Sequence, residues 1–268
     1  KVKVVVVTGG VGGMGKAMVN RFGAEGGRVV VCDLREEGLQ KVVQDMVGKG
    51  VDAHYKVCDV SSLEDVKALA DFAWSEFGHV DILVNNAGIA GMPELIVDSC
   101  EESFQHTFKI NVGGPLNGIR AFGQRIIEQG TPAKILTVCS EAGLYAPGPM
   151  TGIYAASKFA VRAICETLRI EVPEQIHVGC IYPGMVQTEL GGTKEITKSG
   201  MTPDEFINKI WPQIENGEFH IVSHPYGGDY VGESAEEITR AFDRYAPHYE
   251  GDSKYDSRSL ARQLLNEY

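Results

Sequence analysis

The sequence predicts an α/β fold, a doubly wound and mostly seven-stranded parallel sheet with helices on both faces. Short β-branched segments alternate with longer helical patterns along the chain, which is typical of a parallel sheet. The length of 268 residues is common for one α/β domain with a large core. Hydrophobic residues make up 43% and charged residues 23%, as in a globular protein.

Seven segments have the composition of buried strands, and the segments between them have helical periodicity. Strands are expected near residues 2–8, 28–33, 53–58, 81–85, 133–139, 176–182 and 218–223. Helices are expected near residues 13–25, 35–49, 61–77, 101–129, 152–172 and 233–246. No linker, repeat or low-complexity segment interrupts this alternation, so we expect one domain over residues 1–268.

A glycine-rich turn joins the first strand to the first helix. The segment Gly-Gly-Val-Gly-Gly-Met-Gly at 9–15 follows a strand that ends at Thr8 and precedes a helical pattern that begins at Lys16. Glycines in this setting let the backbone approach a pyrophosphate, whose charge faces the helix N-terminus. The context predicts a Rossmann-type dinucleotide site rather than an ordinary turn.

The second strand ends on an acidic residue, Asp33. Alone, this residue could be a loop or cap aspartate, but it lies about 20 residues beyond the glycine turn, as in dinucleotide sites. Its carboxylate would accept hydrogen bonds from the adenosine ribose and repel a 2′-phosphate. Leu34 follows directly, and Arg35 is the nearest basic residue. We therefore expect NAD as the cofactor, with Arg35 as the one feature that would favour NADP.

A tyrosine and a lysine lie four residues apart, at Tyr154 and Lys158. In a helix this spacing places both side chains on one face. The ammonium favours the phenolate, so the tyrosine could act as an acid or base near neutral pH. The pair alone also occurs on solvated helix faces, and its meaning depends on the motifs upstream.

These motifs, in this order, resemble the short-chain dehydrogenase/reductase family in its shorter, single-domain branch. The resemblance covers roughly residues 2–190. Its motifs are Thr8-Gly9-x-x-x-Gly13-x-Gly15, Asp59-Val60, Asn85-Asn86-Ala87-Gly88, the tetrad Asn111, Ser140, Tyr154 and Lys158, and the segment from Pro183 to Thr188.

The resemblance implies hydride transfer between a nicotinamide and a secondary alcohol or ketone. Tyr154 would exchange the proton, Lys158 would also hold the nicotinamide ribose, and Ser140 would orient the substrate oxygen. Asn111, expected in the middle of a helix where asparagine is disfavoured, would position a water on a proton path. The implied cofactor-binding residues are Gly9, Gly13, Met14, Gly15, Asp33, Leu34, Asp59, Val60, Asn86, Ala87, Gly88, Tyr154, Lys158, Pro183, Gly184, Val186 and Thr188.

The substrate is expected to be hydrophobic or aromatic, because the segments beside the tetrad are largely apolar. Two roles stay open for Glu141: it meets a polar substrate group, or it faces solvent. The expected substrate-binding residues are Ser140, Ala142, Leu144, Tyr145, Met150, Tyr154, Met185 and Trp211.

An insert at residues 187–217 follows the expected nicotinamide segment. It has a possible hinge at Gly191-Gly192, a polar stretch and an amphipathic pattern near 204–215 that Thr202 or Asp204 could cap. A long loop here is expected to be a mobile lid, with a packing elaboration as the alternative. The tail, 247–268, has a weak helical pattern near 257–267; it either covers a neighbouring subunit or lies on the surface.

The net charge of −11 argues against nucleic acid or an anionic membrane as the partner. The resemblance implies a small alcohol or ketone as the substrate. The six cysteines form no Cys-x-x-Cys pair, which indicates reduced thiols that serve as packing residues. Because there is also no signal-peptide pattern, we expect a cytoplasmic protein. The sequence lacks an initiator Met, so we expect that the chain was processed or trimmed. His220 and His224 are not expected to bind metal, since they lie on and after a strand without an intervening Glu. A homodimer or homotetramer is expected through 101–129 and 152–172.

Three functions compete. The leading one is an NAD-dependent alcohol dehydrogenase or ketone reductase acting on CH–OH groups. The second is a sugar-nucleotide epimerase or dehydratase of the same fold, which the glycine spacing and the length disfavour. The third is a non-catalytic NAD-binding regulator, which the complete tetrad disfavours. Release of NADH with a panel of alcohols would separate the first from the third.

Overall fold

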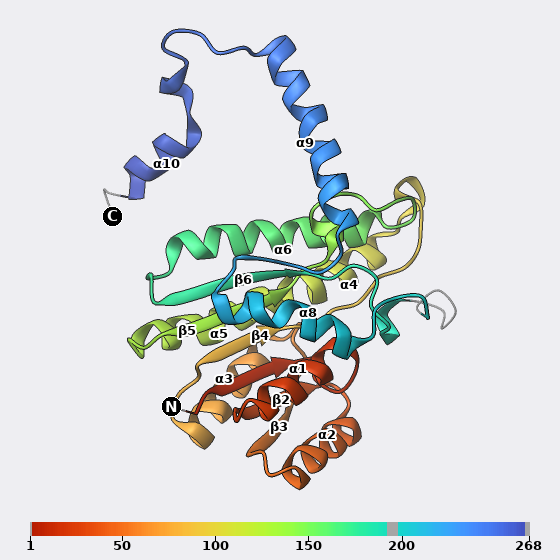
Figure 1. The fold of residues 1–268 in the computed structure, drawn as a ribbon, viewed down its shortest axis with the longest axis vertical. Coiled ribbons are helices and arrows are strands. Elements are labelled where there is room, and N and C mark those ends of the chain that lie inside the picture. The colour runs from red at the N-terminus through yellow and green to blue at the C-terminus, as the bar shows by residue number, and fades with distance from the viewer. Residues whose placement is uncertain (1, 192–197, 266–268) are drawn as a thin grey trace. The chain divides into compact units, whose positions relative to one another are not determined.

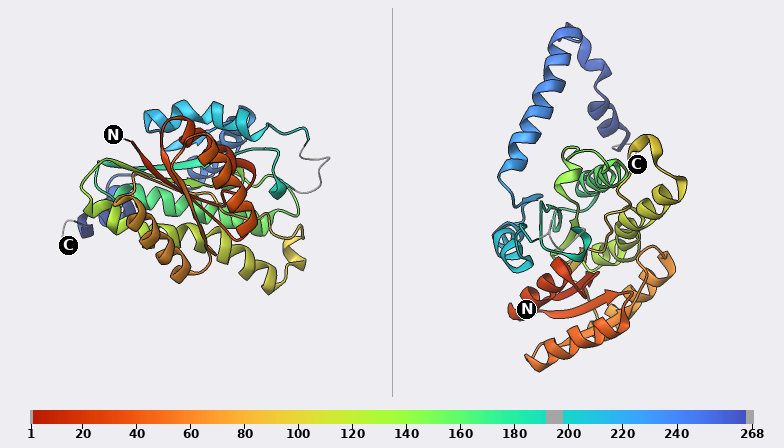
Figure 2. Two further views of the ribbon diagram at one scale, coloured as in Figure 1. Left: turned by 90° about the horizontal axis from the view of Figure 1, so that it is seen from below. Right: turned by 90° about the vertical axis from the view of Figure 1, so that its right-hand side faces the viewer.

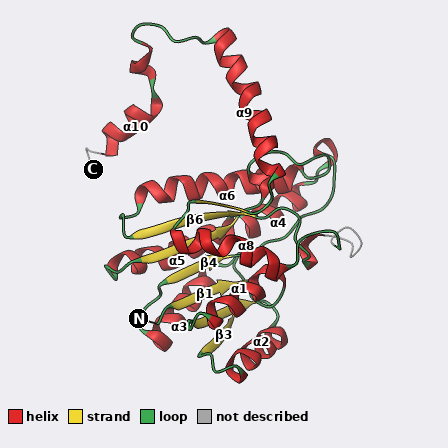
Figure 3. Ribbon diagram, in the orientation of Figure 1, coloured by secondary structure: helices red, strands yellow, loops and turns green. Residues whose placement is uncertain are grey.

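The computed structural model describes residues 2–191 and 198–265, which group into two compact units, Lys1–Gly227 and Gly228–Tyr268. The first unit contains a seven-stranded sheet in which every strand pairing is parallel (Figures 1 and 3). Helices cover both faces of this sheet, which confirms the predicted fold class (Figure 2).

The strand order is β3-β2-β1-β4-β5-β6-β7, so the chain reverses direction across the sheet between β1 and β4. In such sheets, the carboxyl ends of the strands on either side of the reversal flank a crevice that binds ligands. The strands are β1 (Val4–Thr8), β2 (Arg28–Asp33), β3 (Ala53–Val57), β4 (Ile82–Asn85), β5 (Ala133–Val138), β6 (Ile176–Tyr182) and β7 (His220–Val222).

Strand β1 shows how the two hydrophobic layers form. Successive side chains of a strand point to opposite faces. Val5 and Val7 pack in one layer, against α1 (Gly13–Ala24), α2 (Glu36–Gly48) and α8 (Pro203–Asn216). Val4 and Val6 pack in the other, against α3 (Leu63–Phe77), α5 (Gly113–Glu128) and α6 (Gly152–Glu171). All four valines are fully buried, as the continuous β-branched run of a central parallel strand requires.

The helix expected over residues 101–129 is two helices. Helix α4 (Glu101–Asn111) ends at Asn111, and α5 begins at Gly113 after a break at Val112. The Asn111 side chain donates to the carbonyl of Ile89 at 2.9 Å and accepts from its N–H at 2.8 Å. Asn111 is therefore a helix-terminal residue that binds a neighbouring loop, and the prediction of a mid-helix position was wrong.

Helix α8 belongs to the core, which corrects the prediction that this half of the insert is a mobile lid. Phe206 and Ile210 are fully buried, and the Trp211 ring meets Phe22 of α1 edge-on at 4.9 Å between centroids. Thr202 caps the helix in a reciprocal capping box with Glu205, as one of the two expected caps. For α8, the alternative of a packing elaboration is therefore correct. Residues 192–197, which include Gly192 of the expected hinge, lie outside the described residues.

The second unit contains most of α9 (Tyr226–Tyr245), a short 3-10 turn (Asp252–Tyr255) and α10 (Ser257–Leu265). The helices expected near 233–246 and 257–267 are both present, and α9 begins earlier than expected. No residue of α9 is buried, although Ile238 and Phe242 are large and apolar. Within the described part of the chain, no helix combines the length and apolar character needed to cross a membrane.

We predict that truncating the buried face of α8 destabilises the protein. Ile210→Ala removes a fully buried side chain and should lower the free energy of unfolding by about 2–5 kcal/mol. Ile170→Ala makes the same change on α6, where Ile170 is 72% exposed, and should cost less than about 1 kcal/mol. Urea unfolding followed by circular dichroism measures both. Equal effects would show that α8 is not part of the core.

Candidate functional site

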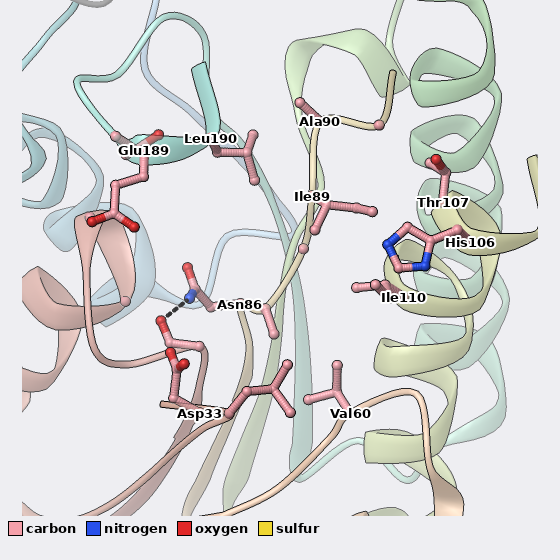
Figure 4. Close-up of a pocket in the computed structure, with 18 of the residues that line it drawn as sticks. Asp33, Val60, Asn86, Ile89, Ala90, His106, Thr107, Ile110, Glu189 and Leu190 are labelled. Carbon is pink, nitrogen blue, oxygen red and sulfur yellow. Dashed lines mark hydrogen bonds between the residues drawn. The ribbon is translucent and has the colours of Figure 1, made fainter. Parts of the chain in front are cut away.

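A cavity of about 880 Å³ lies at the carboxyl edge of the sheet, beside the ends of the neighbouring strands β1 and β4. Its walls come from the glycine turn after β1, the residues that follow β2, β3 and β4, the face of α4, and the segment after Thr188 (Figure 4). This is the crevice in which the sequence predicts the dinucleotide.

The glycine turn has a geometry that only glycine satisfies at two points. Gly13 has a φ of +50°, a conformation that side chains rarely adopt. A Cβ on Gly15 would lie 2.1 Å from the carbonyl oxygen of Gly9 and 2.5 Å from the Asn86 amide nitrogen. The turn therefore packs tightly against β4 on one side, while Gly9, Gly12 and Gly13 present their backbone to the cavity.

Thr8 and Asn86 bind the ends of β1 and β4 together. The Asn86 side chain donates to the carbonyl oxygens of Thr8 and Gly9, at 2.8 and 3.1 Å. The Thr8 hydroxyl accepts from the backbone N–H groups of Asn86 and Ala87, at 3.0 and 3.1 Å. These four hydrogen bonds fix the turn next to the segment Ala87-Gly88, which also lines the cavity.

At the other end of the cavity, Asp33 is the last residue of β2 and organises an ionic cluster. Its carboxylate accepts hydrogen bonds from the backbone N–H groups of Val11 and Arg35. The Arg35 Nε lies 3.2 Å from Asp33 Oδ1, and its Nη1 lies 3.0 Å from Glu189 Oε2. The pKa of Arg35 is raised, mainly by its hydrogen bond to Asp33 and to a smaller extent by its hydrogen bond to Glu189. The sequence indicated Asp33 and Arg35 but not Glu189.

The structure brings Asn111 and Lys158 together behind Gly88, which lines the cavity. A Cβ on Gly88 would lie 3.2 Å from Asn111 Oδ1 and 3.6 Å from Lys158 Nζ. Lys158 is 5% exposed, and its ammonium lies 5.6 Å from the centre of the Tyr154 ring and donates to the carbonyl of Val138 at 3.3 Å. Ser140 follows β5, and its hydroxyl accepts from the N–H of Ala142.

Helix α6 holds the Tyr154-Lys158 pair through its neighbours. The Ser157 hydroxyl donates to the Tyr154 carbonyl at 2.6 Å and accepts from the Asn111 amide at 3.1 Å. The Cys139 thiol donates to the Lys158 carbonyl at 3.1 Å, and burial raises the pKa of this thiol well above its usual value. Cys139 is thus a protonated packing group rather than a nucleophile, as the sequence indicated.

The segment Pro183-Gly184-Met185 follows β6 and turns against His224. The Gly184 N–H donates to His224 Nδ1 at 3.2 Å, and the Ser223 hydroxyl lies 2.7 Å from the same nitrogen. Met185 lines a second cavity of about 530 Å³ with His224 and Tyr226. In the described part of the chain, no three His, Cys, Asp or Glu side chains are grouped as metal ligands.

Most of the expected cofactor-binding residues line the main cavity, and five do not. Those on its wall are Gly9, Gly13, Met14, Gly15, Asp33, Leu34, Asp59, Val60, Asn86, Ala87, Gly88 and Thr188. Those not on its wall are Tyr154, Lys158, Pro183, Gly184 and Val186, and the Val186 side chain is 5% exposed within the core.

One wall of the cavity was missed by sequence reasoning. Ser103, His106, Thr107 and Ile110 of α4 line it, opposite Ile89 (Figure 4). Their spacing of three or four residues marks one helix face and continues to Asn111, the tetrad member on the same helix. That spacing was the signal that could have identified them.

The expected substrate residues have different environments, and two of the expectations were wrong. Trp211 lies in the core under Arg21, and Ala142 is 1% exposed. Neither presents a side chain to a ligand. Tyr145 is largely buried, whereas Met150 and Met185 are exposed by 48% and 41%, and Met150 has a φ of +64°. Glu141 is half-buried, and its Oε2 is buried with no hydrogen-bond partner among the described residues.

The family model described as short chain dehydrogenase matches residues 3–199. This chain belongs to the short-chain dehydrogenase/reductase family. It is 34% identical, over 86% of its length, to the "Probable oxidoreductase EphD" of Mycobacterium tuberculosis, and it spans 38% of the length of that relative. It is also 34% identical to the diacetyl reductase [(S)-acetoin forming] of Staphylococcus epidermidis, over 70% of this chain and 73% of the relative.

Solved structures of other short-chain dehydrogenases have the same fold. A member from Burkholderia phymatum in complex with NAD is 26% identical, covers 93% of this chain and 98% of its own, and superposes with a TM-score of 0.85. An alcohol dehydrogenase from Thermococcus sibiricus complexed with 5-hydroxy-NADP is 26% identical, covers 83% of this chain and 96% of its own, and superposes with a TM-score of 0.76. Members of the family are thus found with either type of nicotinamide dinucleotide.

Proposed function

We propose that this protein is an NAD-dependent oxidoreductase that interconverts a secondary alcohol and a ketone on a hydrophobic or aromatic small molecule. The main support is the buried Lys158 ammonium, which lies beside the Tyr154 ring and next to the cavity wall at Gly88. Among the described residues, no carboxylate lies within ion-pair distance of it. An unpaired buried charge costs stability, and such groups concentrate at functional sites.

The cavity fits a dinucleotide on two counts. The backbone of Gly9, Gly12 and Gly13 is exposed at the start of α1, where a pyrophosphate would be favoured by the N–H groups and the helix dipole. The Asp33 carboxylate marks the far end, where it would accept hydrogen bonds from the ribose hydroxyls. When bound, the nicotinamide would supply the hydride chemistry.

The residues of the tetrad then have separate tasks. In alcohol oxidation, Tyr154 would take the hydroxyl proton, with the Lys158 ammonium 5.6 Å from the centre of its ring. The Ser140 hydroxyl would donate to the substrate oxygen and orient it. Asn111 would hold the loop at Ile89 and the hydroxyl of Ser157, and would thereby fix α6 relative to the cavity.

We propose a hydrophobic substrate because Leu144, Tyr145, Met150 and Met185 are the large side chains in the segments that follow Ser140 and Pro183. An apolar wall with few polar groups suits such a ligand better than a sugar phosphate. The half-buried Glu141 carboxylate beside Ser140, with its Oε2 unpaired among the described residues, would meet a hydroxyl or amine on that ligand.

We predict that Tyr154→Phe abolishes most of the activity but not cofactor binding. The ring remains while the exchangeable proton is lost, so kcat should fall by about two to four orders of magnitude. Titration of NADH fluorescence should give a dissociation constant within a few-fold of the wild-type value. Tyr255→Phe makes the same change at a side chain that is 66% exposed in the second unit, and should leave kcat unaltered. Substantial activity in Tyr154→Phe would assign the proton transfer to another group.

We predict that wild-type protein prefers NAD(H) and that Asp33→Asn weakens this preference. The amide removes the charge that repels a 2′-phosphate, so the ratio of kcat/KM with NADP to kcat/KM with NAD should rise by about tenfold or more, equivalent to about 1.4 kcal/mol. Asp71→Asn makes the same change at an exposed position that is paired with Arg125 and lies away from the cavity, and should leave the ratio unaltered. A wild-type preference for NADP(H) would refute the cofactor assignment.

We also propose that the protein is a homodimer or homotetramer that associates through α4 and α6. Phe104 and Phe159 are 39% and 43% exposed on these helices, and Phe104 stacks on Phe108 at 4.5 Å. Phe122, Ile126 and Leu168, which are also apolar residues of 101–129 and 152–172, are buried in the protein's own core and are not part of this surface.

Sedimentation velocity at micromolar concentration should show the dimer or tetramer. Phe104→Ser with Phe159→Ser should shift the distribution toward monomer, whereas Ile238→Ser, at an exposed site on α9, should not. A monomeric wild-type protein would refute the proposed assembly.

A further inference from the structure

We propose that Glu189 strengthens the preference for NAD over NADP by binding Arg35. The inference rests on the proposed function, because it concerns the same cofactor site. Glu189 begins a short 3-10 turn directly after Thr188 and is 154 residues from Arg35 in the sequence. It joins the segment beside the expected nicotinamide position to the adenosine end of the cavity.

Arg35 is the residue that a 2′-phosphate would use. It is the only lysine or arginine among the described residues that line the cavity. It follows Asp33 by two positions. A Cβ on Gly12 would lie 3.6 Å from its Nη2, so the guanidinium lies next to the glycine turn. A phosphate on the ribose held by Asp33 would meet this guanidinium, whose planar fork suits phosphate binding.

In the structure, two carboxylates form ion pairs with the guanidinium of Arg35. The Arg35 Nε lies 3.2 Å from Asp33, and Nη1 lies 3.0 Å from Glu189. A 2′-phosphate would have to compete with both acids, and the cluster of two carboxylates and one guanidinium repels its charge. Without Glu189, Asp33 and Arg35 would form a balanced pair with Nη1 free to donate. The side chain of Glu189 therefore adds to the discrimination against NADP that Asp33 provides.

The position of Glu189 argues against a role in folding. Its side chain is 81% exposed and that of Arg35 is 52% exposed. Ion pairs between such exposed groups contribute little to stability. A change at Glu189 should therefore be detected in the choice of cofactor rather than in the unfolding transition.

The test is a double-mutant cycle on Glu189→Gln, Arg35→Ala and the double variant. The measured quantity is the ratio of kcat/KM with NADP to kcat/KM with NAD. Glu189→Gln should raise this ratio about two- to fivefold, equivalent to about 0.4–1 kcal/mol, and the rise should shrink at high salt. In the Arg35→Ala background, the same substitution should leave the ratio unaltered, because Glu189 acts through Arg35.

Glu174→Gln is the control for net charge. Glu174 is exposed and precedes β6, at the opposite edge of the sheet from the cavity, and its substitution should not alter the ratio. A ratio unaltered in Glu189→Gln, or raised equally with and without Arg35, would overturn the inference while the proposed NAD preference stands. A wild-type preference for NADP would instead refute the proposed cofactor, and the inference with it.

Discussion

The contact between the end of β1 and the end of β4 is the constraint on which the rest of the site depends. The strand order reverses there, so the connections that follow the two paired strands lead to opposite sides of the sheet and leave a crevice. Asn86 and Thr8 exchange hydrogen bonds across the reversal, and Gly15 approaches the Gly9 carbonyl too closely for any side chain. The glycine turn is thereby fixed against Ala87 and Gly88, and its exposed backbone faces the cavity.

The same crevice explains why a lysine can be buried in this protein. Lys158 comes from α6 and Asn111 from the end of α4, and both approach Gly88, where a side chain would crowd them. A hydrogen bond joins the two helices: the Asn111 amide at the end of α4 donates to the Ser157 hydroxyl of α6. Ser157 in turn donates to the Tyr154 carbonyl within α6. The polar network holds the ammonium beside the cavity, and a bound ligand could complete its hydrogen bonding.

The sequence predicted those features that local patterns determine. The β-branched run Val4–Val7 and the glycines that follow have few alternative structures, and the spacing of Tyr154 and Lys158 required only that the segment be helical. The error at α8 has a different cause. Phe206, Ile210 and Trp211 form an apolar stripe that would suit either a lid or a core helix, and the partner that decided the outcome, Phe22, lies far away in sequence. Asn111 ended α4 because of its bonds to Ile89, which no helical pattern reveals.

In the site that we propose, cofactor choice has both a local and a long-range component. Asp33 accepts from the N–H groups of Val11 and Arg35, so one carboxylate orients the glycine turn, positions the arginine and presents itself to the cavity. That component follows from the residues at the end of β2 and was accessible from the sequence. The bond from Arg35 to Glu189 adds a second component that depends on where the chain passes after β6. Because this segment directly follows Thr188, which we propose to contact the nicotinamide, changes made there for another substrate could also alter the charge that a 2′-phosphate meets.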